Sequence, residues 1–274
     1  MWGRKLLGLG LVVVLTACDL MDSNTPEKTS THIEPTMASV EMVATHNFLT
    51  QNAPPVGFSE VHYSPLDSNL SDHPGWSYTM TGNFTGTFDD TGEEASGQFQ
   101  AHVQADELGE RRRVVLTLEG DAFAPDATPL ELEGVRLSND YYTIDVNGQC
   151  KPGDTVIADL STAQLVGGVV VATPTGHRKE ISGVPAWQYG FSVDSVLLPP
   201  TTLKLNENST VVLQADLWVA PNLNAVVLFE MTLNVEHVRL LSGAREVSGT
   251  LYLRYELNIA ELDVQPNISV PHGC

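Results

Sequence analysis

Few residues of this 274-residue chain have the types and spacing that catalysis or metal binding requires. Its 8 histidines are scattered, with no pair three or four positions apart, which argues against a histidine metal site. The carboxylates of Asp89, Asp90, Glu93 and Glu94 crowd one turn and could hold Ca²⁺, although a solvated hairpin tip is the simpler interpretation. The sequence lacks nucleophile-elbow, zinc-protease, phosphate-loop and EF-hand motifs. We therefore expect no catalytic residues, no metal site and no cofactor.

The N-terminus has the parts of an export signal. Arg4 and Lys5 precede an apolar run that is shorter than the ~20 residues a membrane-spanning helix needs. The run ends in Leu-Thr-Ala-Cys at Cys18, which resembles the lipobox of bacterial lipoproteins. This resemblance implies that residues 1–17 are a signal peptide and that Cys18 carries acyl chains. An ordinary signal peptide with an incidental cysteine is the alternative.

A lipidated Cys18 predicts where the protein resides and how the chain is organised. The acyl chains would anchor it in the bacterial cell envelope, facing the extracytoplasmic side. The polar residues 18–35 are expected to form a flexible tether with the lipidated cysteine. Residues 36–274 are expected to form a single β-rich domain, which begins with a short amphipathic helix over 37–48. We expect the protein to be a monomer.

The two remaining cysteines, Cys150 and Cys274, follow an export signal and therefore enter an oxidising compartment. A disulfide between them would close a long loop and hold the C-terminal residue against the fold. Thiol catalysis is the weaker alternative, because no histidine or asparagine constellation accompanies either cysteine.

The charge balance limits the choice of partners. Lys and Arg number 14 against 34 Asp and Glu, a formal net charge of -20. A protein that binds nucleic acid concentrates cations to neutralise phosphates, so we expect no nucleic-acid partner. The same sign argues against docking on anionic lipid through a basic surface.

From Trp76 onward, apolar residues alternate with polar ones along several segments, as in half-buried strands. The clearest segments are 76–88 and 95–105, which form a hairpin, and 227–235 and 247–259 near the C-terminus. Each strand has one apolar face. The combined area of these faces exceeds the largest apolar patch, ~300–600 Å², that soluble proteins leave exposed. The fold class is thus mainly β, with an apolar sheet face that must be covered.

Little helix is available to cover that face. Pro152-Gly153-Asp154 resembles an N-cap, and the spacing of Val156, Leu160 and Ala163 predicts a helix over 155–166. We expect an open half-barrel, a large curved antiparallel sheet with one or two short helices packed on its concave face.

The order of elements also resembles a known family. A lipobox and tether, long hairpin strands and a central helix precede Gly183-Val184-Pro185-Ala186-Trp187-Gln188-Tyr189, then Leu217-Trp218-Val219 and a proline-containing tail that ends at Cys274. This layout is similar to bacterial surface lipoproteins of the LppX/LprG type, which share the fold of the LolA/LolB lipoprotein carriers. The resemblance implies a half-barrel that holds acyl chains between helix and sheet.

By position, the resemblance assigns eleven residues to a hydrophobic ligand site. They are Trp76, Tyr78, Phe84, Phe99, Val156, Leu160, Trp187, Tyr189, Phe229, Met231 and Leu251. For the tryptophans among them, plain core packing is the competing interpretation. Two functions follow. The first is a lipid-anchored protein that binds a hydrophobic or acyl-lipid ligand, and the alternative is a structural or adhesive β-sandwich lipoprotein with no ligand cavity.

Overall fold

The computed structural model describes residues 48, 51–106, 110–124 and 129–274, within a compact unit of residues 42–274. The predicted signal peptide over residues 1–17, Cys18, the predicted tether over 18–35 and most of the helix predicted over 37–48 lie outside the described residues. No described helix has the length and apolar character needed to cross a bilayer.

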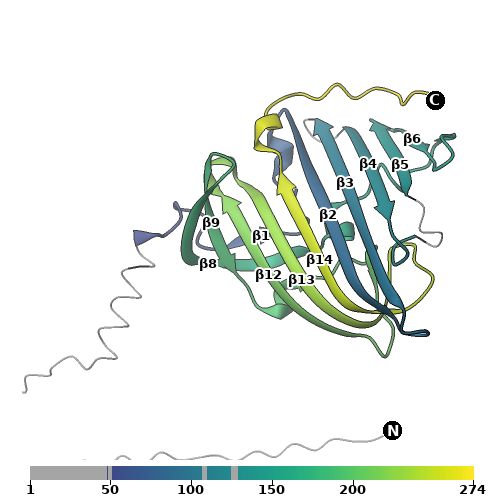
Figure 1. Cartoon of the computed structure of the whole chain (residues 1–274). Coiled ribbons are helices and arrows are strands. Elements are labelled where there is room, and N and C mark those ends of the chain that lie inside the picture. The colour runs from purple at the N-terminus through teal and green to yellow at the C-terminus, as the bar shows by residue number, and fades with distance from the viewer. Residues whose placement is uncertain (1–47, 49–50, 107–109, 125–128) are drawn as a thin grey trace, which may run out of the picture. The chain divides into compact units, whose positions relative to one another are not determined.

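One large open antiparallel sheet forms the fold (Figure 1). The strands are β1 (Val61–Tyr63), β2 (Gly75–Phe88), β3 (Glu94–Asp106), β4 (Arg111–Glu119), β5 (Leu130–Leu137), β6 (Asp140–Ile144), β7 (Cys150–Pro152), β8 (Gly168–Ile181), β9 (Val184–Gly190), β10 (Val196–Leu197), β11 (Leu203–Lys204), β12 (Thr210–Ala220), β13 (Ala225–Leu240) and β14 (Val247–Leu257). The helical elements are η1 (Leu70–Asp72), α2 (Thr162–Leu165), η3 (Val193–Ser195), η4 (Pro221–Leu223) and η5 (Ile259–Glu261).

The strands follow one another in the order β1-β8-β9-β12-β13-β14-β2-β3-β4-β5-β6-β7. β10 pairs with β8, and β11 pairs with β13, outside this path. The last long strand, β14, therefore lies beside the first long one, β2, and Figure 1 shows β8 and β9 on one side of the curved sheet and β5 and β6 on the other. The predicted fold class is confirmed.

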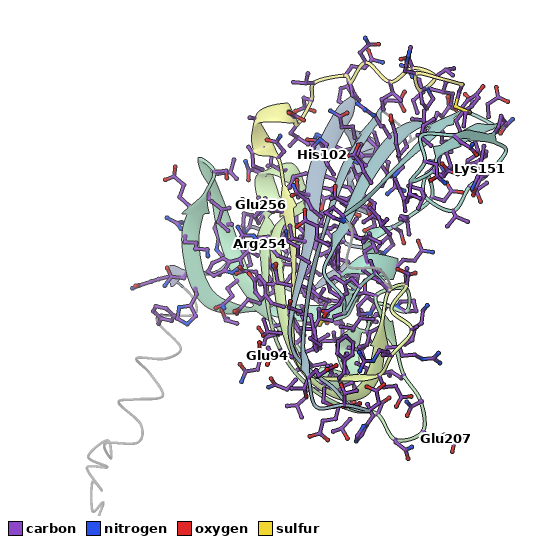
Figure 2. The ribbon with its side chains drawn as sticks, turned by 45° about the vertical axis from the view of Figure 1, so that its right-hand side comes forward. Glu94, His102, Lys151, Glu207, Arg254 and Glu256 are labelled. Carbon is purple, nitrogen blue, oxygen red and sulfur yellow. A yellow bond between two sulfur atoms is a disulfide. The ribbon has the colours of Figure 1, made fainter. Side chains whose placement is uncertain are left out.

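The two-residue period of the sequence determines which face is buried. In β2, Tyr78, Met80 and Phe84 are at most 1% exposed, whereas Asn83 and Thr85 between and beside them are exposed. The same alternation continues in β3, β13 and β14, so that the inner side chains of adjacent strands form one hydrophobic core. Ion pairs lie on the opposite face, where Arg254 of β14 is 3.2 Å from Glu230 and 2.8 Å from Glu256 (Figure 2).

The connection between β7 and β8 joins strands from distant parts of the sheet. Residues 153–167 form this connection, and their backbone contacts the sheet at Gly134 of β5. A Cβ built on Gly134 would lie 2.3 Å from the amide nitrogen of Ala158, so a larger residue would push the connection away. We call residues 153–167 the crossover.

The helix predicted over 155–166 is wrong for most of its length, because only α2, Thr162–Leu165, is helical. The Asp154 carboxylate instead accepts a hydrogen bond from the Val156 amide at 3.0 Å and forms a turn. The N-cap is Ser161, whose side chain and that of Gln164 form a capping box. Val156 is consequently 68% exposed and does not face the core as predicted.

The predicted pairing of Cys150 with Cys274 is confirmed, with an S–S distance of 2.01 Å. It fastens the C-terminal residue to β7, at the edge of the sheet where the crossover begins. The bond closes a loop with a sequence separation of 124, and a loop of this size restricts the unfolded chain strongly.

We expect Cys150→Ser to lower the free energy of unfolding by about 2–5 kcal/mol, because the unfolded chain gains entropy. Denaturant titration with and without reductant measures the loss. Reduction of the wild-type protein should have the same effect, and reductant should leave a Cys150→Ser/Cys274→Ser variant unchanged. Equal stability of the oxidised and reduced wild-type protein would contradict the prediction.

Candidate functional site

The concave face gathers almost every residue that the sequence assigned to a ligand site. Ten of the eleven are at most 8% exposed. These are Trp76, Tyr78, Phe84, Phe99, Leu160, Trp187, Tyr189, Phe229, Met231 and Leu251. Val156 is the exception, since its side chain points to solvent, and Ile157 and Leu160 bury the apolar side of the crossover instead. Trp218 lies in the opposite phase to the buried Leu217 and Val219.

Two short segments of the chain supply apolar side chains that pack against the hydrophobic core. One is the crossover, which contributes Leu160 and Leu165, and the other is residues 64–72, which contribute Leu66 and Leu70. All four side chains are at most 5% exposed. We call the two segments together the cover. The role of residues 64–72 could not be predicted from the sequence. The stretch is rich in Ser, Asp and Pro, which indicates a loop, and its two leucines are too few to indicate a buried segment.

A chain of hydrogen bonds joins the two segments of the cover to each other. The Thr162 hydroxyl accepts a bond from the Leu66 amide at 2.9 Å and donates to the Asp67 carboxylate at 2.9 Å. The second oxygen of Asp67 accepts a bond from the Tyr78 hydroxyl on β2 at 2.7 Å. The Asp67 carboxylate thus bonds Thr162, 95 positions away in the sequence, and also bonds Tyr78 on the sheet.

Arg112 of β4 extends this chain to the crossover. Its Nη2 donates to the Tyr78 hydroxyl at 2.9 Å and to the Leu160 carbonyl at 2.5 Å. An arginine on an apolar face is costly unless its donors are satisfied, and here they hold the crossover in place. We call Asp67, Tyr78, Arg112, Thr162 and the Leu160 carbonyl the latch. It is the polar element that positions the cover over the concave face.

Beside the latch lies a hydroxyl without a hydrogen-bond partner among the described residues, that of Tyr255 on β14. The rings of Tyr255 and Tyr78 are 5.1 Å apart, and both side chains are fully buried. Burial raises the pKa of both phenols well above the usual value. Tyr63 and Tyr189 are buried nearby, and burial raises the pKa of Tyr63 to about 12. The interior therefore combines hydrocarbon with phenols that stay neutral.

Three depressions of the described surface lie outside the latch, with volumes of about 190, 400 and 400 Å³. The first is lined mainly by polar side chains of β2, β3 and β4, together with Phe99. The other two lie around Arg245 and around Ile259, and all three are open to solvent. No latch residue lines any of them.

The acidic turn that could hold Ca²⁺ is an exposed hairpin tip that pairs with an arginine. Arg245 Nη2 lies 2.5 Å from an Asp90 carboxylate oxygen, and this contact holds the pKa of the Asp90 carboxyl below its usual value. Glu93 is also within 3.9 Å of the same guanidinium. The four carboxylates therefore do not converge on one point, since Asp89 turns toward a different neighbour.

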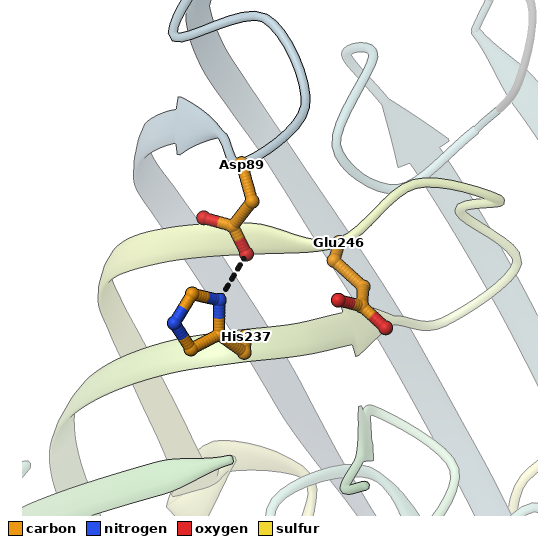
Figure 3. A group of neighbouring side chains, drawn as sticks. All are labelled: Asp89, His237 and Glu246. Atoms are coloured by element: carbon orange, nitrogen blue, oxygen red, sulfur yellow. Dashed lines mark hydrogen bonds and ion pairs between the residues drawn. The ribbon is translucent and has the colours of Figure 1, made fainter. Parts of the chain in front are cut away.

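Asp89, His237 and Glu246 bring three possible ligand atoms within 4.8 Å of one another (Figure 3). The sequence separates Asp89 from His237 by 148 positions, so spacing could not indicate this group. Each member already has a partner, with His237 Nδ1 3.0 Å from Asp89 and Asn206 donating to Glu246 at 3.0 Å. The three side chains are therefore part of a hydrogen-bonded surface network.

No protein-family model and no curated protein matches this chain.

The latch predicts that a Tyr→Phe substitution changes the stability differently at Tyr78 and at Tyr255, whose rings are neighbours in the core. Tyr78→Phe should destabilise the fold by about 1–3 kcal/mol, because Asp67 and Arg112 each lose a buried partner. Tyr255→Phe removes only an unpartnered hydroxyl and should leave the stability unchanged or raise it. Urea titration of the two variants makes the comparison, and equal losses would contradict the assignment of the latch.

The buried phenols also predict a loss of stability in alkali. Burial raises the pKa of the Tyr63 phenol to about 12, from an ordinary value of 10.0. The stabilising effect of its neutral form is therefore complete below pH ~10 and is lost as the pH rises toward ~12, by about 1.4 kcal/mol per pH unit. Urea midpoints measured across this range should fall less steeply in Tyr63→Phe. A parallel decline in both proteins would rule out the contribution of Tyr63.

Proposed function

We propose that this protein is a non-catalytic, lipid-anchored binding protein that holds a hydrophobic ligand between its curved sheet and the cover. The observation that carries the proposal is a continuous apolar concave face closed by two short segments that a small polar latch holds in place. Acyl chains fit such a site, because they bind by burial alone and need few polar partners.

The anchoring part of the proposal comes from the sequence. Cys18 ends a segment that resembles a lipobox, so the domain would be held at the extracytoplasmic side of a bacterial envelope membrane. The open half-barrel architecture is the one that the resemblance to LppX/LprG-type lipoproteins implies, and this agreement supports assigning the protein to that group.

The energetics of opening favour a cover that exchanges with a ligand. A net hydrogen bond contributes about 0.5–1.5 kcal/mol, and bonds to charged groups about 1.5–3 kcal/mol. Lifting the cover breaks the latch and exposes Leu66, Leu70, Leu160 and Leu165. Each methylene of an acyl chain that takes their place recovers about 0.8 kcal/mol. A long acyl chain therefore offsets the cost of opening.

A structural or adhesive lipoprotein without a ligand is the second candidate. The near-complete burial of the predicted lining residues by the protein's own side chains favours it. A single open sheet, rather than the two sheets of a sandwich, would then serve as a rigid scaffold. The two candidates differ in whether the concave face ever admits a ligand.

An exchange assay separates them. Thr162→Val removes the hydroxyl that joins the two segments of the cover, whereas Thr250→Val removes an exposed hydroxyl that donates to Asn234 at 3.0 Å. With a fluorescent fatty-acyl probe, Thr162→Val should bind several-fold faster than the wild type, and Thr250→Val should bind at the wild-type rate. Native mass spectrometry of the gently extracted wild-type protein should show a bound lipid. No probe binding by any form, together with lipid-free protein, would support the scaffold function.

A further inference from the structure

β8 carries a basic surface in a protein that is otherwise strongly acidic. His177, Arg178 and Lys179 are consecutive and exposed, in a chain with 14 Lys and Arg against 34 Asp and Glu. Net charge describes the whole chain, and the fold decides where the few cations gather. We call these three residues with Trp187 and Trp218 the basic hairpin.

Most described arginines form ion pairs with carboxylates, but Arg178 and Lys179 of the basic hairpin do not. Arg111, Arg245 and Arg254 each form an ion pair. Within the described ranges, neither Arg178 nor Lys179 has a carboxylate within ion-pair distance, although the exposed Glu180 follows them in the chain. Their charges are therefore available to an external anion.

Each of these two cations lies over a tryptophan ring. The Arg178 guanidinium is 5.4 Å from the centre of the Trp187 ring, and Lys179 Nζ is 4.0 Å from that of Trp218. A cation–π contact leaves the positive charge uncompensated while it orients the side chain. Tryptophan beside Lys or Arg is the combination that favours the interface between lipid headgroups and water.

The chain enters the domain at the same place. The Phe48 ring lies 5.7 Å from the His177 ring, and the Trp187 indole donates to the Asn52 carbonyl at 3.0 Å. Figure 1 shows these first described residues beside β8 and β9. Cys18 precedes Phe48 in the sequence, so a chain held by a lipid on Cys18 leads to this side of the domain. A lipid on Cys18 would thus keep the basic hairpin near the membrane surface.

We propose that the basic hairpin faces the membrane and binds the anionic headgroups of its phospholipids, which orients the anchored domain. This inference rests on the proposed lipidation of Cys18, but not on any ligand in the concave face. An anionic surface repels the acidic remainder of the protein within a Debye length of about 8–10 Å, so the domain approaches with a cationic surface first. Lys204 and Arg239 form another exposed cationic pair, but of the described cations only those of the basic hairpin lie over tryptophan rings and beside the residues where the chain enters the domain. Phosphate oxygens then bind the Arg178 guanidinium and Lys179 Nζ, and Trp218 reaches the headgroup layer.

Charges on an exposed strand edge can also serve only to prevent strands from pairing between molecules. Beyond Ala172, β8 has no described partner on the side away from β9, so this simpler role applies to Arg178 and Lys179. Glutamate blocks such pairing as well as lysine does. Charge reversal therefore removes attraction to the membrane while it preserves protection of the edge.

The test uses the full-length lipidated protein anchored in vesicles of brominated phosphatidylcholine, with or without phosphatidylglycerol. Bromine quenches tryptophan fluorescence only at close range, and Trp218→Phe shows which part of the signal belongs to Trp218. The variant is Arg178→Glu/Lys179→Glu. The matched control is Lys204→Glu/Arg239→Glu, two exposed cations that pair in register on β11 and β13. Leu228 of β13 pairs with Trp218. Arg239 lies further along the same strand, at most roughly 35 Å from Leu228 at ~3.3 Å per residue, so the control cations are remote from Trp218.

Phosphatidylglycerol should increase quenching of the wild type and the control severalfold, and added salt should reverse the increase. Arg178→Glu/Lys179→Glu should stay at the level seen in phosphatidylcholine alone, although it floats with the vesicles as the wild type does. Quenching that does not depend on phosphatidylglycerol, or that falls equally in both double variants, would overturn the inference and leave the ligand proposal intact. Failure of the wild-type protein to float with vesicles would refute the lipid anchor and this inference together.

Discussion

The structure depends on one connection, the crossover that carries the chain from β7 to β8. These strands lie in distant parts of a single open sheet, so residues 153–167 must pass between them. A segment buried in this way must bring apolar side chains and must satisfy its own backbone. Leu160 meets both demands, because its side chain enters the core and its carbonyl accepts a hydrogen bond from Arg112.

The latch explains how so short a cover keeps a defined position. Hydrophobic contacts have no direction, so leucines alone would let residues 64–72 and the crossover slide over the concave face. Asp67 accepts hydrogen bonds from Thr162 and Tyr78 and thereby fixes both segments against β2. The defined position of the cover therefore depends on a small number of polar contacts among Asp67, Tyr78, Arg112 and Thr162.

Sequence reasoning succeeded where a pattern is local and failed where contacts join distant segments. Alternation predicted β2, β3, β13 and β14, because a side chain on a strand points to the opposite face from its neighbours. The helix expected over 155–166 is mostly irregular, because the Asp154 carboxylate forms a turn with the Val156 amide and the N-cap falls at Ser161. Leu66, Asp67 and Arg112 gave no signal, because their partners lie far along the chain.

The sequence alone indicated the β class, the one-sided burial of its strands and the pairing of Cys150 with Cys274. These properties follow from periodicity, composition and a small number of cysteines, which are local or countable. Only the tertiary structure decided what covers the concave face and which cations lie over tryptophan rings. Both depend on contacts between residues far apart in the sequence, such as Asp67 with Thr162 and Lys179 with Trp218. A local sequence pattern does not indicate such contacts, because they form only when the fold brings the residues together.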